Sequence, residues 1–239
     1  MGANKKPIGW HPPTQEQLQA VSNALAAQNG LNTVPGQEHA LDIYLHKSVI
    51  LREFFLLRLR FMIALMNRLW RRGQLKRARM LDLGGGSGIV SSMLSPYVGH
   101  IDLLDLDCAA AALLFGLVPA GNVMLHEKDA LTWQPESAPD IIVAADVLEH
   151  FRELPPILSR IHQWMGADSV LFTSLPTENI WYLVLRKIFN KTKPWDHYHT
   201  SDEVEAALRA HGFKRVARLC HPLGLPLFAL FSISAWKKA

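Results

Sequence analysis

The chain has 239 residues, 49% of them hydrophobic, and a formal net charge of +4. This length and composition can bury one sizeable core, and the two cysteines, Cys108 and Cys220, are too few for the disulfide framework of a small secreted protein. Prolines at positions 7, 12 and 13 interrupt the stretch where a secretory signal would be apolar, so we expect a cytoplasmic protein.

The positive charge is concentrated in the N-terminal third. Residues 1–79 contain 12 Lys or Arg and 4 acidic residues, whereas residues 80–239 contain 13 and 17. The acidic remainder argues against a nucleic-acid partner, because such enzymes normally place basic residues around the substrate cleft. The basic part instead suggests an anionic partner or surface.

Two helices are expected before residue 78. Thr14 and Gln17 form a capping-box pattern, and apolar residues follow at helical spacing until Asn29-Gly30. A longer helix is expected over about residues 40–72, with a main apolar stripe and a second side that mixes arginines, among them Arg58 and Arg68, with apolar residues. Charges interrupt this helix too often for it to span a membrane.

Two interpretations of the second side of the long helix stay open. The first is packing against a neighbouring element, because apolar helix positions are usually buried. The second is a basic amphipathic surface over residues 48–72, which lies on an anionic membrane or holds a lipid-like substrate. In the second case the protein would be peripheral on the inner membrane surface.

From residue 79 onward, strand-like runs alternate with helical patterns, which predicts a parallel sheet. The expected strands are 79–83, 100–105, 122–127, 140–145 and 169–175. The uncharged stretch 219–236 could suggest a membrane segment, but Pro222, Gly224 and Pro226 divide it, and we expect a strand over 227–236. Residues 1–77 are therefore interpreted as a helical extension and residues 78–239 as the main domain.

A glycine-rich turn follows the first expected strand, in the sequence MLDLGGGSG from Met80 to Gly88. Gly84, Gly86 and Gly88 stand two apart, which allows a sharp turn into a helix with no Cβ between the backbone and a ligand. Asp105 ends the second strand, where a carboxylate of a doubly wound fold accepts hydrogen bonds from ribose hydroxyls. This pattern predicts an adenosine cofactor, and Asp107 could replace Asp105 if the strand ends two residues later.

The spacing G-x-G-x-G, led by Asp82, resembles motif I of the class I S-adenosylmethionine-dependent methyltransferases. Residues 127–130 and 141–150 resemble the endings of the third and fourth strands in that family, so the likeness covers about residues 78–238. It implies a Rossmann-like, doubly wound α/β sheet of order 3-2-1-4-5-7-6. The sheet would be mostly parallel, with an antiparallel C-terminal hairpin near 213–220 and 227–236.

The same resemblance implies S-adenosylmethionine as the cofactor. The residues that would bind it are Asp82, Gly84, Gly86, Asp105 and Asp129. By this resemblance Asp105 takes the ribose and Asp129 the adenine amino group, while Asp82 orients the turn or the ammonium group.

Asp146, Glu149 and His150 follow the fourth strand, at the edge where open parallel sheets bind ligands. His150 is a candidate general base, because imidazole titrates near working pH. A similar Glu-x-x-Glu-His segment supplies metal ligands in the ubiquinone-biosynthesis O-methyltransferases, with Asp146 here in place of the first Glu. Mg²⁺ is therefore an alternative, but the Leu-Glu-His ending also occurs in relatives without a metal, and we predict no metal ligand.

Residues 176–200 follow the fifth strand, where the family commonly inserts a lid that binds the acceptor. Aromatic and polar side chains there could form an apolar pocket with a few orienting contacts. His197 is a second candidate base, and His199 is expected to brace the helix that begins at Thr200. Asp146, His150 and His197 are thus the predicted catalytic residues.

The resemblance implies methyl transfer to a small-molecule or lipid-like acceptor, and we expect oxygen as the methylated atom. The Asn/Asp-Pro-Pro-Tyr segment common in amino-group methylation is absent, since Ala-Asp-Val-Leu stands at 145–148. Two rivals stay open. One is an RNA methyltransferase that uses the basic helix, and the other is a non-catalytic membrane or partner adaptor that retains the cofactor fold.

Overall fold

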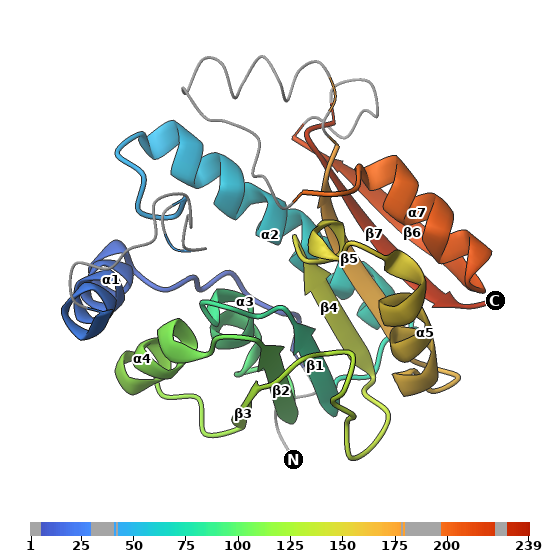
Figure 1. Cartoon of the computed structure of the whole chain (residues 1–239), viewed down its shortest axis with the longest axis horizontal. Helices are drawn as coiled ribbons and strands as arrows, with labels where there is room; N and C mark the ends of the chain where they lie inside the picture. Colours follow the sequence, from blue (N-terminus) through green and yellow to red (C-terminus); the bar gives the residue numbers. More distant parts are fainter. Residues whose placement is uncertain (1–5, 30–40, 42, 178, 180–196, 223–228) are drawn as a thin grey trace.

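A computed structural model describes residues 6–29, 41, 43–177, 179, 197–222 and 229–239. Its centre is a seven-stranded sheet of order β3-β2-β1-β4-β5-β7-β6 (Figure 1). Five strands are parallel: β1 (Arg79–Leu83), β2 (His100–Asp105), β3 (Val123–Glu127), β4 (Ile141–Ala145) and β5 (Val170–Pro176). The last two, β6 (Phe213–His221) and β7 (Phe231–Lys238), are antiparallel. The predicted strand order and C-terminal hairpin are confirmed.

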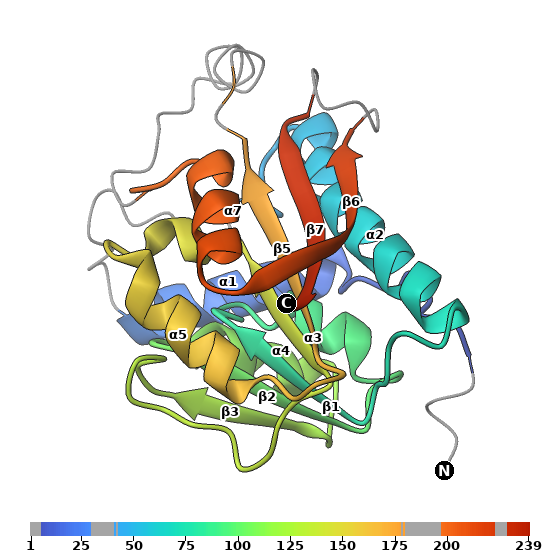
Figure 2. The same cartoon turned by 90° about the vertical axis from the view of Figure 1, so that its right-hand side faces the viewer.

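Helices cover both faces of the sheet (Figures 1 and 2). One face carries α1 (Gln15–Asn29), α2 (Val49–Arg71), α3 (Ile89–Leu94) and α4 (Ala109–Leu117), and the other carries α5 (Leu154–Trp164) and α7 (Ser201–Ala210). Alternation along the strands explains this arrangement, because Met80 faces the first layer and Leu81 the second. The N-terminal extension therefore shares one apolar core with the sheet.

Helix α2 begins at Val49, not near residue 40 as predicted. The Ser48 side chain accepts a hydrogen bond from the Leu51 amide, and this cap fixes the start of the helix. The helix crosses β5, β6 and β7 and places nine residues in the interior. No helix among the described residues is both long and apolar enough to cross a bilayer.

The second side of α2 is largely covered by the chain itself. Arg58 and Leu65 are buried, and Phe54, Leu57 and Phe61 are half-buried. This burial supports the packing interpretation for these positions. The helix keeps an exposed basic stripe of Arg60, Arg68 and Arg71.

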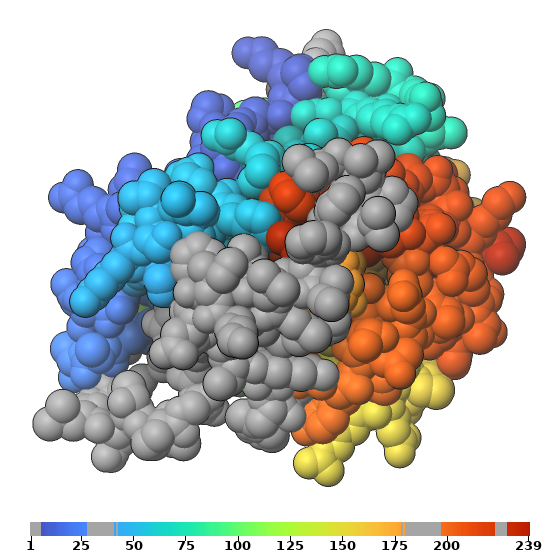
Figure 3. All heavy atoms as spheres, turned by 90° about the horizontal axis from the view of Figure 1, so that it is seen from above, coloured from blue at the N-terminus to red at the C-terminus, as the bar shows by residue number. Residues whose placement is uncertain are grey.

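Because β1 to β5 are parallel, their carboxyl ends lie at one edge of the sheet, the upper edge of Figure 1. Seen from that side, α2 and α7 flank the molecule on opposite sides (Figure 3). Ligands of open parallel sheets bind at this edge. The predicted site residues lie in the last two positions of these strands, in the segments that follow them or, in the case of His197, in the segment before α7 that contacts His150.

Candidate functional site

The turn after β1 has a backbone that favours glycine. Gly84, Gly86 and Gly88 have φ of 68°, 40° and 73°, in the left-handed region. A Cβ on Gly84 would lie 2.3 Å from Val147 Cγ2, and one on Gly85 would lie 2.6 Å from Leu103 Cγ. Gly85 was not singled out from the sequence, where its place in an unbroken glycine run was the available signal. Glycine at positions 84 and 85 thus lets the turn pack directly against Val147 and Leu103.

Asp105 joins this turn to the end of β2. The Gly86 amide donates a hydrogen bond to Asp105 Oδ2 at 2.8 Å, and the Asp107 amide donates to Asp105 Oδ1 at 3.1 Å. Asp107 Oδ1 accepts a hydrogen bond from the Ala109 amide at the start of α4. Asp105 is therefore the carboxylate at the glycine turn, and Asp107 caps a helix.

Two further predicted carboxylates belong to β1 and to the segment after β3, on either side of β2. Asp82 is only 2% exposed and accepts a hydrogen bond from the Ser91 hydroxyl at 2.6 Å, which ties β1 to α3. Burial raises the pKa of Asp82 to about 6, with a smaller contribution from the nearby charge of Asp105. Asp129 lies beyond the end of β3 and is exposed, and its Oδ1 accepts a hydrogen bond from the Leu131 amide. Asp82 thus lies one residue before the end of β1, and Asp129 lies two residues after the end of β3, at the same edge of the sheet.

Asp146, directly after β4, is held by a residue that sequence reasoning did not place in the site. Its Oδ2 forms a salt bridge with Arg58 Nη1, and Ser174 on β5 donates from its hydroxyl to Oδ1 at 3.5 Å. Asp146 also has a positive φ of 53°. The sequence placed Arg58 on a possible outer surface, although its spacing of four from Phe54 and Met62 put it on an apolar helix side.

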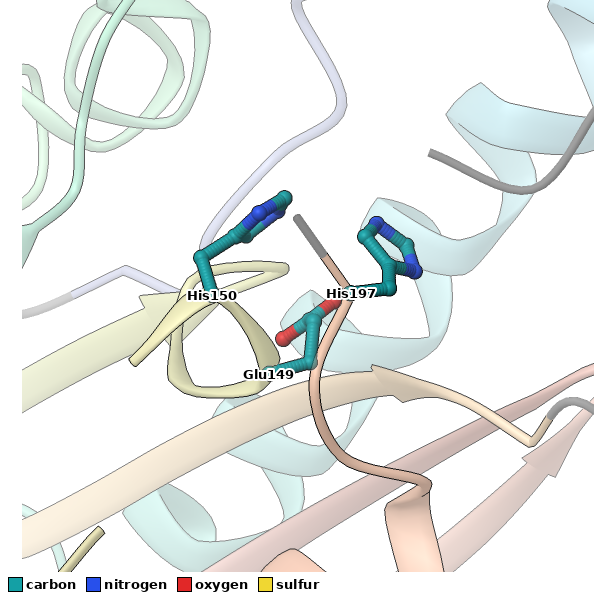
Figure 4. Close-up of side chains that lie close together, drawn as sticks. All are labelled: Glu149, His150 and His197. Carbon is teal, nitrogen blue, oxygen red and sulfur yellow. The ribbon is translucent and has the colours of Figure 1, made fainter. Parts of the chain in front are cut away.

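Glu149, His150 and His197 form a cluster from two segments far apart in the sequence (Figure 4). The short 3₁₀ helix η2 (Leu148–His150) supplies the first two, and the segment leading to α7 supplies His197. One side-chain N or O atom from each lies within 4.8 Å of the others. The imidazole ring centroids are 4.7 Å apart, and the Tyr198 amide anchors the second segment on the Glu149 carbonyl at 2.9 Å.

This cluster can accept a proton or offer two nitrogen atoms and a carboxylate oxygen to a divalent ion. It differs from the magnesium alternative of the sequence, because Asp146 is turned toward Arg58 and His197 takes a place beside Glu149. Mg²⁺ prefers oxygen ligands, so a cluster with two imidazoles suits it poorly. Proton transfer is the simpler chemistry for this arrangement.

The predicted lid at 176–200 lies mostly outside the described residues, as do Trp181, Tyr182, Trp195 and Asp196. His199 is among the described residues, and its Nε2 atom lies 3.2 Å from the carbonyl oxygen of Arg152. Directly after it, Thr200 and Glu203 form the capping box of α7. The His199 ring thus contacts the segment after η2, and its expected role in bracing α7 stays a prediction.

Residues 54–218 match the model of a family described as a methyltransferase domain. The chain is 28% identical over 96 residues to a trans-aconitate 2-methyltransferase from Methylobacterium radiotolerans. The aligned stretch covers 40% of this chain and 37% of that protein. It is 25% identical over 148 residues to a ubiquinone biosynthesis O-methyltransferase from Rhodopseudomonas palustris. This alignment covers 56% of this chain and 57% of that protein. The chain thus aligns with between a third and three fifths of the length of these relatives.

Solved structures share the fold. The magnesium protoporphyrin IX methyltransferase of Synechocystis with bound S-adenosylhomocysteine superposes with a TM-score of 0.64 at 17% identity, over 91% of this chain and all of that one. The N-methyltransferase NodS of Bradyrhizobium japonicum, also with S-adenosylhomocysteine, gives a TM-score of 0.59 at 14% identity, over 93% and 98%. At these identities the likeness shows the fold alone.

Proposed function

The chain belongs to the class I S-adenosylmethionine-dependent methyltransferases, a family whose cofactor is S-adenosylmethionine, and from this premise we propose that it methylates a small-molecule acceptor at oxygen. The single observation that carries the proposal is the composition of one sheet edge. There the glycine turn and Asp105 lie beside Asp146 and the pair of imidazoles at His150 and His197. One half of the edge suits an adenosine cofactor, and the other suits an acceptor that must lose a proton.

In the cofactor half, Gly84 and Gly86 leave room for the ligand against the backbone, and Asp105 binds the ribose hydroxyls. Asp105 already accepts two backbone amides, which fix the direction of its carboxylate. Asp82 orients the turn through Ser91 and does not need to touch the cofactor. Asp129, after β3, accepts a hydrogen bond from the adenine amino group.

In the acceptor half, the chemistry is an in-line displacement in which the sulfur leaves as a neutral thioether. The protein has to align the acceptor oxygen with the methyl group and, for a hydroxyl, remove its proton. His150 and His197 are the candidate bases because both rings lie in one cluster at the carboxyl edge, and Asp146 orients the acceptor. No metal ion enters this proposal.

One relative is an O-methyltransferase of ubiquinone biosynthesis, which supports oxygen as the methylated atom. NodS, an N-methyltransferase, shares the fold, so the fold alone does not select the atom. Among the described residues, the exposed apolar pair Val49 and Ile50 lies at the start of α2, the end of this helix at the upper left of Figure 1. This pair and the basic stripe of α2 support a lipid-like acceptor and a peripheral position on an anionic membrane.

Calorimetry and methyl transfer together test the proposal. Purified protein should bind S-adenosylmethionine and S-adenosylhomocysteine but not NAD. Radiolabelled methyl groups should then pass to phenols or carboxylates in a panel that also contains amines and RNA. Transfer to amines alone would contradict oxygen as the acceptor atom, and salt-dependent RNA retention with RNA methylation would favour the RNA alternative. Tight cofactor binding without transfer to any class would favour the non-catalytic adaptor.

A further inference from the structure

We propose that Arg58 is a positioning residue of the methyl-transfer site, which holds Asp146 in place and keeps its carboxylate charged. This role deepens the proposed function and rests on it, since it concerns the acceptor half of the site. Arg58 lies in the middle of α2, and only 6% of its surface is exposed. A guanidinium at this depth is almost always paired and does not belong to a basic outer surface.

The guanidinium is fixed by contacts that do not involve Asp146. Arg58 Nη2 donates to the Tyr44 hydroxyl at 2.8 Å, and Nε donates to the Phe55 carbonyl at 3.2 Å. Arg58 Cζ also lies 5.3 Å from the ring centroid of Phe231 on β7. These contacts leave Nη1 directed toward Asp146, with which it forms the salt bridge. Arg58 is thus preorganised by the N-terminal extension and by the hairpin.

Asp146 is a residue that needs such support. It follows β4 directly and has a φ of 53°, a left-handed conformation that is uncommon for non-glycine residues and is adopted among them mostly by Asn and Asp. Backbone outliers of this kind persist where the surroundings hold them, and they cluster at functional sites. The Asp146 amide donates to the Ser174 carbonyl at 2.9 Å, and the salt bridge on Oδ2 holds the side chain. About a quarter of the side chain, 23%, remains exposed at the carboxyl edge.

The exposed part of Asp146 can accept a hydrogen bond from a hydroxyl or amino group of the substrate that is methylated. Arg58 favours the ionised carboxylate, which is a hydrogen-bond acceptor only. Among the described residues, Glu149 and His150 follow Asp146 on the same segment, and the Tyr44 hydroxyl and the His221 ring both interact with Arg58. A purely stabilising role explains less, because a buried ion pair contributes little net stability compared with apolar residues of similar volume.

The Arg58→Met variant can be compared with Arg60→Met. Arg60 lies on the same helix but is exposed and stacks over Trp10, so its loss controls for the removal of a helical charge. Carboxyl ¹³C NMR, with the Asp146 resonance assigned through Asp146→Asn, gives the pH midpoint of that carboxylate. In Arg58→Met the midpoint should rise by about one pH unit or more, and in Arg60→Met it should stay at the wild-type value.

Arg58→Lys should restore most of the wild-type midpoint, because it keeps the positive charge. The Kd for S-adenosylhomocysteine should stay within about threefold of the wild-type value in all variants. This measurement would detect damage to the cofactor site independently of the Asp146 midpoint. An unchanged Asp146 midpoint in folded Arg58→Met overturns the proposal. If Arg58→Met does not fold, Tyr44→Phe tests the proposal in its place. It removes the hydroxyl that fixes the guanidinium, and it should raise the Asp146 midpoint by part of the amount expected for Arg58→Met. An unchanged midpoint there overturns the proposal as well.

Discussion

The amide of Gly86 donates a hydrogen bond to Asp105 Oδ2 at 2.8 Å, which joins the glycine turn after β1 to the end of β2. The contact brings together two sequence signals 19 residues apart. Asp105→Ala should weaken S-adenosylhomocysteine binding by roughly 1–3 kcal/mol, the usual cost of losing hydrogen bonds to a charged group. Calorimetry would measure the change.

Asp107→Ala is the matched control for Asp105→Ala. Its carboxylate accepts the Ala109 amide and caps α4, so the variant should lose some stability but keep its cofactor affinity. If Asp107→Ala lost the affinity and Asp105→Ala kept it, the assignment of the ribose carboxylate would have to be reversed.

Asp82 should make the protein less stable as the pH rises. Its pKa of about 6 in the folded protein exceeds the ordinary 3.8, so the folded state holds this proton more tightly than the unfolded state. The free energy of unfolding should therefore fall between about pH 4 and pH 6 by about 3 kcal/mol from this group. Asp82→Asn keeps an acceptor for the Ser91 hydroxyl and removes the titration.

Urea denaturation of both proteins from pH 4 to pH 7.5 would measure this effect. The wild type should lose stability relative to Asp82→Asn over the window, and the variant should be the more stable protein at pH 7.5. A constant difference between the two across the window would show that Asp82 has an ordinary pKa.

His221 should give the opposite pH dependence. Its ring is buried against Phe54, Phe61 and Phe231, and neither ring nitrogen has a hydrogen-bond partner among the residues that the structure describes. Burial, and to a smaller extent the charge of Arg58, lowers the pKa of His221 to about 4 from 6.5. Its contribution to stability is therefore complete above about pH 6.5 and is lost as the pH falls toward 4, by about 2–3 kcal/mol.

His221→Leu removes the titrating ring and keeps an apolar side chain in the cluster. The variant should lose less stability than the wild type between pH 6.5 and pH 4, as measured by urea denaturation at matched ionic strength. An equal loss in both proteins would assign the acid sensitivity to other groups.

The sequence predicted the sheet, and the closeness of the glycine turn to Asp105, because these signals are local. The apolar runs, the glycine turn and Asp105 lie within one strand-turn-helix-strand unit, and the fold keeps them in that order. The acceptor half depends on contacts between distant segments. Arg58 meets Asp146 only because α2 lies across the sheet with one side inward, and that rotation is set by packing. A mixed side of a helix does not reveal which arginine will be buried.

His150 and His197 are each expected to lower turnover when replaced by alanine. If one of them removes the acceptor proton, its loss should reduce kcat by about 10²–10⁴-fold and leave S-adenosylhomocysteine affinity nearly unchanged. His199→Ala is the matched control, since its ring contacts the Arg152 carbonyl and not the cluster. Wild-type kcat in both single variants would leave alignment alone as the source of catalysis, and a rate insensitive to chelators would exclude a metal ion.

The exposed end of α2 should bring the protein to anionic membranes. Val49 and Ile50 are 58% and 75% exposed, and the stripe of Arg60, Arg68 and Arg71 lies further along the same helix. Each basic residue near an anionic surface contributes about 1 kcal/mol, and salt screens this attraction. Binding to vesicles that contain phosphatidylserine should therefore be measurable by sedimentation in low salt and weaken steeply as salt is added.

Two variants separate the apolar and electrostatic parts of this membrane binding. Replacing Val49 and Ile50 by serine removes apolar insertion, and replacing Arg60, Arg68 and Arg71 by glutamine removes the attraction. Both sets lie away from the cofactor half, so S-adenosylhomocysteine affinity should stay at the wild-type value. Because Arg58 is buried and paired with Asp146, its replacement should leave vesicle binding unchanged. If the wild-type protein does not bind anionic vesicles in low salt, α2 serves only to cover the sheet and to hold Arg58 at the site.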